Sequence, residues 1–120
     1  LIGNIAIVPR KSTETRYVYV IADMLEAKIL YDDVNLKQTA IMIAHHLAEN
    51  NNVPADILDA DVRFASAVFD IINAKRHYRM AEKEKDDGQM FIYENKFVIA
   101  NEKADNCKME IQQKFNNLFS

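Results

Sequence analysis

The hydrophobic positions of the N-terminal part of the chain follow two different patterns. The opening IGNIAIVPR is rich in β-branched residues and ends at Pro9, which predicts a short strand or an extended arm over residues 1–11. From Tyr17 to Tyr31 the apolar residues recur every three or four positions, which predicts a helix. RYVYVI alone is also typical of a strand, but the continuation of the stripe through ADMLEAKILY favours the helix.

A second helix is predicted to open at Asn35, which together with Gln38 resembles a capping box. Its apolar residues share one face: Leu36, Ala40, Ile43, Ala44 and Leu47. The stretch ENNN that follows favours a turn, because an Asn side chain hydrogen-bonds to its own backbone. Pro54 is then suited to the first turn of a further helix.

The third predicted helix runs from about Ala55 towards Asp87 and is the longest. Between Ile57 and Ile72 its apolar residues cover about half of the circumference, which indicates burial from more than one side. An unbroken helix of this length would reach ~45 Å, more than a compact domain of this size comfortably covers. We therefore expect its far end to protrude, to pack on another subunit or to fray.

Residues 89–100, QMFIYENKFVIA, contain two short apolar runs around Glu94–Asn95 and predict a β-hairpin. A final amphipathic helix is predicted from apolar residues on one face: Ala104, Cys107, Ile111, Phe115 and Leu118. The expected fold is therefore mainly α. It is a single helical domain over residues 1–120 with about four helices, and its minor β element comes from the N-terminal strand and the hairpin near 89–100.

Composition narrows the classes of protein to which the chain can belong. Of its 120 residues 49% are hydrophobic and 28% are charged, which is typical of a globular domain. The single Cys107 excludes an internal disulfide and indicates a reducing, cytoplasmic setting. No apolar run approaches the ~18 residues that a membrane helix requires. A net charge of −3 argues against nucleic acid as the main partner. The start at Leu1 rather than Met is expected of a fragment or a processed product.

Two adjacent histidines are the first candidates for chemistry. On a helix, His45, His46 and Glu49 fall on one polar arc, at spacings that allow a shared metal ion. The spacing matches neither the H-E-x-x-H helix nor the E-x-x-H of di-iron bundles. Histidines near a helix C-terminus are also stabilised by the helix dipole, so we expect them to face solvent.

The acidic residues of the third helix divide into two sets. Asp56 and Asp59 lie in its opening turn, where unsatisfied N–H groups stabilise carboxylates. Asp61 instead projects into the apolar face between Ile57 and Ala65. A carboxylate at such a position must be paired, hydrogen-bonded or functional. The alternative is that the regular helix starts at Asp61, which would then be its N-cap.

One resemblance suggests an enzyme. ILDADVRFASAVF resembles the E-x-x-D helix of the all-α nucleotide pyrophosphohydrolases, with Asp56 and Asp59 at the acidic positions. The likeness is confined to this helix, because the companion E-x-x-E pair is missing and its nearest match, Asp23 with Glu26, is followed by Ala27. The resemblance implies Mg²⁺-dependent nucleotide hydrolysis through carboxylates on two helices: Asp23, Glu26, Asp56 and Asp59, with Asp61 as a further catalytic acid.

A basic cluster suggests nucleic-acid binding. It comprises Lys75, Arg76, Tyr78 and Arg79, a mixture of cations with an aromatic ring that suits an RNA or phosphate group. The acidic residues in EKEKDD follow within one or two turns and can neutralise it, for example through Glu82 and Arg79. We therefore expect an ion-paired helix end rather than a nucleic-acid site.

The leading interpretation is a non-enzymatic interaction or assembly module without a cofactor, whose partner is another protein or a second copy. Its expected surface lies on the 57–72 helix and the C-terminal helix: Ile57, Val62, Phe64, Phe69, Ile71, Phe115 and Phe119. The alternatives are the Mg²⁺-dependent hydrolase and a nucleic-acid-binding accessory protein.

Overall fold

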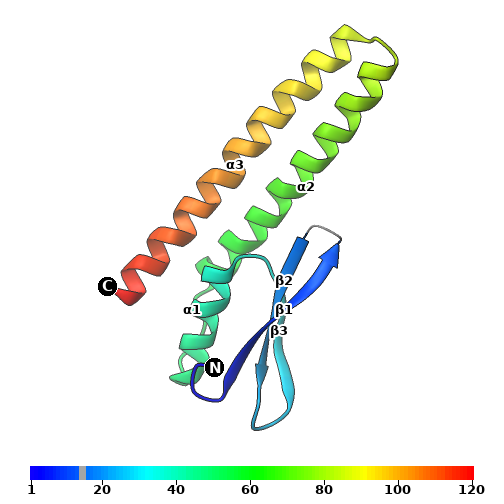
Figure 1. The fold of residues 1–120 in the computed structure, drawn as a ribbon. Helices are drawn as coiled ribbons and strands as arrows, with labels where there is room; N and C mark the ends of the chain where they lie inside the picture. The colour runs from blue at the N-terminus through cyan, green and yellow to red at the C-terminus, as the bar shows by residue number, and fades with distance from the viewer. Residues whose placement is uncertain (14–15) are drawn as a thin grey trace. The chain divides into compact units, whose positions relative to one another are not determined.

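The computed structural model describes residues 1–13 and 16–120, and within them three strands precede three helices (Figure 1). The elements are β1 (Ile5–Thr13), β2 (Arg16–Asp23), β3 (Lys28–Val34), α1 (Lys37–Ala48), α2 (Ala55–Lys83) and α3 (Asp87–Phe119). The fold is thus mixed α and β, although helices dominate it. The predicted mainly α fold of about four helices is wrong.

The chain separates into two compact units. Unit 1 comprises Leu1–Val62 together with Glu110–Ser120, and unit 2 comprises Arg63–Met109. Helices α2 and α3 each contribute to both units. Unit 2 consists of the later part of α2, a short turn and the earlier part of α3, and we refer to it as the helical hairpin. Within the described residues, no helix combines the length and the apolar character that crossing a membrane requires.

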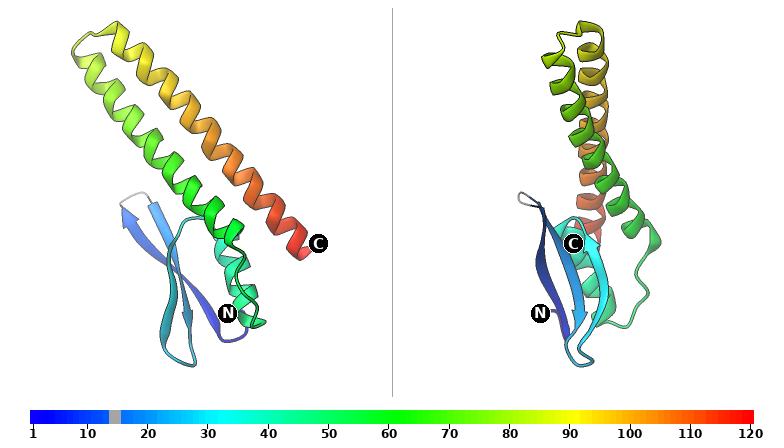
Figure 2. Two further views of the ribbon diagram at one scale, coloured as in Figure 1. Left: turned by 180° about the vertical axis from the view of Figure 1, so that it is seen from behind. Right: turned by 90° about the vertical axis from the view of Figure 1, so that its right-hand side faces the viewer.

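The strands of unit 1 form an antiparallel meander in the order β1-β2-β3 (Figure 2). Tyr19 in the central strand pairs with Pro9 on one side and with Val34 on the other. A proline is tolerated in β1 because an edge strand leaves one row of N–H groups unpaired. The predicted N-terminal strand is confirmed, and it starts at Ile5.

The helix predicted from Tyr17 to Tyr31 is wrong, because this segment forms β2 and β3. Both sides of β2 are buried: Val18 and Val20 are at most 9% exposed and the adjacent Ile21 is fully buried. Burial on both faces makes the strand a continuous apolar run, and such a run also satisfies a helical spacing.

The turn between β2 and β3 carries no glycine or proline. Instead, the Asp23 carboxylate accepts hydrogen bonds from the backbone N–H of Leu25 at 2.9 Å and of Glu26 at 3.2 Å. Ala27 then adopts a positive φ of 51°. An Asp side chain that bonds to the backbone two residues ahead reverses the chain without the usual turn residues. The turn therefore shows little sign of a break in its residue types.

Unit 1 holds the large buried side chains. One cluster lies between the sheet and α1: Ile5, Ile21, Val34, Ala40, Ile43 and Ala44. A second cluster joins α1 to the first turns of α2 and the last turns of α3: Met42, Ile57, Ala60 and Ile111. The apolar face predicted for the second helix is therefore confirmed as a core-facing surface of α1.

The asparagine-rich segment ends α1, as predicted. Asn50 has a φ of 56°, and its N–H donates to the Leu47 carbonyl at 3.1 Å, while the N–H of Asn51 donates to the His46 carbonyl at 2.8 Å. These two bonds form the Schellman motif that satisfies the last carbonyls of a helix. The predicted capping box is wrong, because Leu36 is the N-cap and has no side-chain cap bond.

The same motif ends α2. Lys85 has a φ of 56°, and the N–H groups of Lys85 and Asp86 donate to the carbonyls of Glu82 and Ala81 at 3.1 and 3.0 Å. The Asp86 carboxylate then accepts a bond from the N–H of Gln89 at 3.1 Å and caps α3. This tight turn makes the two helices antiparallel.

The β-hairpin predicted over 89–100 is wrong, because α3 runs without a break from Asp87 to Phe119. Its inner side carries the half-buried Tyr93 and Phe97, and its outer side carries Phe91 and Val98, which are exposed. Apolar residues on two opposite sides of one helix conceal the single stripe by which a helix is usually identified.

Candidate functional site

The seam of the helical hairpin, which is the line along which α2 and α3 pack on each other, is made of small side chains. The buried residues of α2 in this unit are alanines spaced seven apart, and α3 contributes two alanines and a cysteine: Ala67, Ala74, Ala81, Ala100, Ala104 and Cys107. Larger half-buried residues alternate with the alanines of α2: Phe64, Ile71 and Tyr78. Alternating spacings of three and four residues are those of paired helices in a coiled coil.

Aromatic and cationic contacts join the two helices along this seam. The rings of His77 and Tyr93 stack with centroids 4.9 Å apart and an interplanar angle of 16°. The Lys75 ammonium lies 5.3 Å from the centre of the Phe97 ring, at a distance that permits a cation–π interaction. These contacts pair α2 with α3 without burying any large apolar side chain completely.

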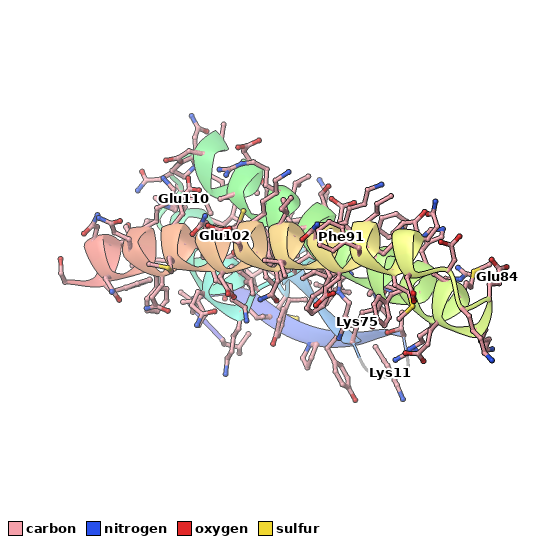
Figure 3. All side chains as sticks on the ribbon, turned by 90° about the horizontal axis from the view of Figure 1, so that it is seen from above. Lys11, Lys75, Glu84, Phe91, Glu102 and Glu110 are labelled. Atoms are coloured by element: carbon pink, nitrogen blue, oxygen red, sulfur yellow. The ribbon has the colours of Figure 1, made fainter. Side chains whose placement is uncertain are left out.

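The large apolar residues of the helical hairpin instead face outwards and are between 44% and 69% exposed. They are Phe69, Ile72 and Met80 on α2, and Phe91, Ile92, Val98, Ile99 and Met109 on α3. Figure 3 shows Phe91 among the side chains of α3. Because contiguous exposed apolar surface marks interaction sites in soluble proteins, these outer faces are the candidate site.

The structure distributes the predicted surface residues over three environments. Val62, Phe69 and Phe119 are exposed, whereas Phe64 and Ile71 are half-buried in the seam. Ile57 and Phe115 belong to the core of unit 1, beside Met42 and Ile111.

Several outer residues of α3 were missed, because their segment was interpreted as a β-hairpin. The signal that could have found them is a repeat of seven residues, from Phe91 to Val98 and from Ile92 to Ile99.

One flank of the helical hairpin carries a groove whose lining mixes polar and apolar side chains. A cavity of about 370 Å³ lies between the helices, and its lining includes Asp70, Asn73, Lys96 and Lys103 as well as Ile99. The mixture of signs gives the groove no strong preference for an anion or a cation. The exposed apolar residues of the two helices therefore remain the candidate site.

Asp61, the acid that the sequence places on an apolar face, has a structural explanation. Asp61 is 4% exposed, and its carboxylate accepts bonds from the backbone N–H groups of Asn35 at 2.9 Å and Leu36 at 3.0 Å, and from the Asn35 side-chain amide at 3.0 Å. The N-cap interpretation of Asp61 is wrong, because α2 begins six residues earlier, at Ala55. The carboxylate instead satisfies donors at the start of α1, where negative charge also suits the helix dipole.

The carboxylates of the hydrolase alternative do not lie on two facing helices. Asp23 ends β2 and Glu26 lies in the turn after it, whereas Asp56 and Asp59 are exposed in the first turns of α2. A bond from the Lys114 ammonium to Asp56 at 2.7 Å lowers the pKa of that carboxyl below its ordinary value. Among residues 1–13 and 16–120, no three His, Cys, Asp or Glu side chains form a group suited to a metal ion.

The adjacent histidines have partners of their own. His45 Nε2 lies 3.3 Å from the Glu49 carboxylate, and its ring meets Phe119 edge to face with centroids 4.9 Å apart. His46 is half-buried beside Pro54 and Asp56. The two rings therefore contribute to the packing of unit 1.

The four residues of the basic cluster point in different directions. Lys75 lies over Phe97, Tyr78 is half-buried in the seam, and Arg76 and Arg79 are exposed. In the part of the chain that the structure describes, neither arginine has an ion pair, so the expected bridge between Arg79 and Glu82 is not formed. The exposed arginines are available to a partner.

Comparison of the chain with protein-family models, with curated proteins and with solved structures gives no match. The chemistry of the site therefore rests on the geometry described above.

Proposed function

We propose that this protein is a non-enzymatic assembly module that binds further copies of itself through the outer faces of its helical hairpin. The observation that supports this function is the inverted distribution of side chains in that unit. Its buried positions hold alanines and a cysteine, while its phenylalanines, isoleucines and methionines are exposed or only half-buried. A helix pair that leaves its largest apolar side chains in solvent favours a further layer of packing.

The exposed apolar area is of the size that a reversible interface requires. Eight large apolar side chains of the helical hairpin are 44–69% exposed, three of them on α2 and five on α3. At roughly 100 Å² each they offer about 800 Å² in total when the outer side of one α2 meets the outer side of another α3, which corresponds to a small, reversible interface. The partner is a second copy, because each outer face has the three- and four-residue spacing with which one helix packs on another.

No cofactor is needed for this role. The buried Cys107 is a free thiol, as expected of a protein that functions in a reducing compartment such as the cytoplasm. Of the alternatives, hydrolysis would require carboxylates that converge, and nucleic-acid binding would use the exposed Arg76 and Arg79.

The test is the mass of the protein in solution as a function of its concentration. We expect the native chain to associate, and Phe69→Ser to weaken association by at least about tenfold, which corresponds to about 1.4 kcal/mol. Ile29→Ser is the matched control, because Ile29 is 63% exposed but belongs to β3 in unit 1. A native chain that stays monomeric at all concentrations, or an equal effect of the two substitutions, would contradict the proposal.

A further inference from the structure

The outer side of α2 carries a stripe that changes from apolar to basic along the chain. Its members recur at intervals of four, three, four and three residues: Ala65, Phe69, Ile72, Arg76 and Arg79. Such intervals place side chains on one side of a helix, and the seam alanines occupy the opposite side. We refer to these five residues as the α2 stripe.

The outer side of α3 carries a stripe with the same intervals that changes from apolar to acidic. Its members are Phe91, Asn95, Val98, Glu102 and Asp105. Ile92 and Ile99 flank its apolar part and are also exposed. We refer to these five residues as the α3 stripe, of which Figure 3 labels Phe91 and Glu102.

The charged ends of both stripes lack partners within the chain. Arg76, Arg79, Glu102 and Asp105 are exposed, and none of them takes part in an ion pair or a hydrogen bond in the described ranges 1–13 and 16–120. Two cations on one helix and two carboxylates on the other thus stand at matching positions of two matching stripes. This arrangement suits an intermolecular contact better than an intramolecular one, because the two stripes face away from each other.

We propose that the α2 stripe of one copy packs in parallel against the α3 stripe of the next copy. This inference rests on the proposed self-association and specifies which surfaces meet. In register, the opposed pairs are Ala65 with Phe91, Phe69 with Asn95, Ile72 with Val98, Arg76 with Glu102 and Arg79 with Asp105. In this register the small Ala65 opposes the large Phe91, the apolar Ile72 meets Val98, and both ion pairs form.

The two ion pairs fix the register, because the apolar contacts alone do not, and Asn95 opposes the apolar Phe69. Any shift of the stripes by one turn would separate Arg76 from Glu102 and Arg79 from Asp105.

Charge favours the parallel alignment over the antiparallel one. If the apolar parts of the two stripes met in antiparallel orientation, Glu102 and Asp105 would lie against the first turns of α2. There the two carboxylates would meet the apolar Leu58 and Val62 instead of Arg76 and Arg79, and both ion pairs of the parallel alignment would be lost.

The contact has a consequence for the size of the assembly. It joins two different surfaces, so a pair of copies retains a free α3 stripe on one copy and a free α2 stripe on the other. A contact of this heterologous kind produces growing chains unless its rotation closes a ring. The assembly is therefore expected to exceed a dimer.

Charge reversal tests this alignment directly, with the mass in solution measured by sedimentation. We expect R76E/R79E and E102R/D105R each to weaken association at least tenfold, and the fourfold variant that combines them to restore it. A mixture of the two double variants should also recover association, because the acidic α2 stripe of one variant pairs with the basic α3 stripe of the other and the two native stripes pair with each other. Lys96→Glu with Lys103→Glu is the matched control, since it changes the net charge as R76E/R79E does, but in the groove between the helices.

The outcomes separate this inference from the proposed function. If the native chain associates but the fourfold variant does not recover, the parallel alignment is wrong and self-association stands. A control variant that associates as weakly as R76E/R79E also overturns the alignment, because net charge then explains the loss. A native chain that remains monomeric overturns both proposals. Circular dichroism of each variant verifies that the exposed substitutions leave the helices folded.

Discussion

The two units of this chain differ in the size of the side chains that fill their interiors. Unit 1 buries Ile21, Met42, Ile43 and Ile111 at no more than 1% exposure, whereas the buried positions of the helical hairpin hold only alanine and cysteine. Burial of a large aliphatic side chain contributes ~1.5–3 kcal/mol, and an alanine methyl contributes far less. The difference teaches that unit 1 draws stability from a core of large side chains, while the helical hairpin leaves its large apolar surface exposed for the self-association that we propose.

The largest expected effect is a difference in stability loss between two substitutions, one in each unit. Ile43→Ala should destabilise the chain by about 2–5 kcal/mol, because Ile43 is fully buried and its loss leaves a cavity. Phe69→Ala should change the stability of the monomer by no more than about 0.5 kcal/mol, because Phe69 is 62% exposed. Urea denaturation at low protein concentration measures both, and equal losses would remove the distinction between the units.

The second-largest expected effect is the loss of stability when the buried carboxylate of Asp61 in unit 1 is replaced. Asp61→Asn replaces an acceptor of three hydrogen bonds with a group that has one acceptor oxygen and an N–H donor facing other donors. The expected loss is about 2–3 kcal/mol, since buried donors are left unsatisfied. Asp70→Asn on the exposed surface of the helical hairpin is the control and should be neutral. A neutral Asp61→Asn would show that the carboxylate does not anchor α1.

The seam of the helical hairpin should tolerate no larger residue. Ala74→Leu is expected to cost about 1–3 kcal/mol, because Ala74 is 4% exposed and the helices would have to separate. Asn101→Leu, which introduces the same side chain at an exposed position of α3, should leave the monomer's stability nearly unchanged. Thermal unfolding of both variants gives the comparison. An Ala74→Leu chain as stable as the native one would mean that the seam is loose.

The smallest expected effect is a change in the stability of unit 1 with pH. The bond from Lys114 lowers the pKa of Asp56, so the pair stabilises the fold above about pH 4 and loses this contribution as the pH falls through the lowered value. The Asp56 side chain is 60% exposed, which limits the effect to less than about 1 kcal/mol. Asp56→Asn should therefore be slightly less stable than the native chain at pH 7 and equal to it at pH 2. A difference that persists at pH 2 would contradict this origin.

The comparison between the units also explains what could be predicted from the sequence. Helix α2 and the end of α1 were predicted because Ala55 follows a proline and because ENNN supplies the left-handed Asn50. The two wrong element predictions, the helix over residues 17–31 and the β-hairpin over residues 89–100, concern elements that are apolar on two opposite sides. Burial on both faces gave β2 the appearance of a helix, and an exposed outer face gave the start of α3 the appearance of a hairpin.

The candidate site was predicted only in part for the same reason. Val62 and Phe69 were named from the excess of apolar residues on α2, but the sequence pattern does not tell which of them reach the core. The partners of Asp61 are Asn35 and Leu36, which precede α1 and are distant in the chain, so no local pattern indicates them. Long-range pairing of this kind is visible only in the folded protein.

The distinction between the units is tested most directly by the solution mass of the native chain beside that of a Phe69→Ser/Val98→Ser variant, over a wide range of concentration. The native chain should increase in mass with concentration, while the variant should remain a folded monomer. If both are monomeric at every concentration, the outer faces of the helical hairpin do not mediate self-association.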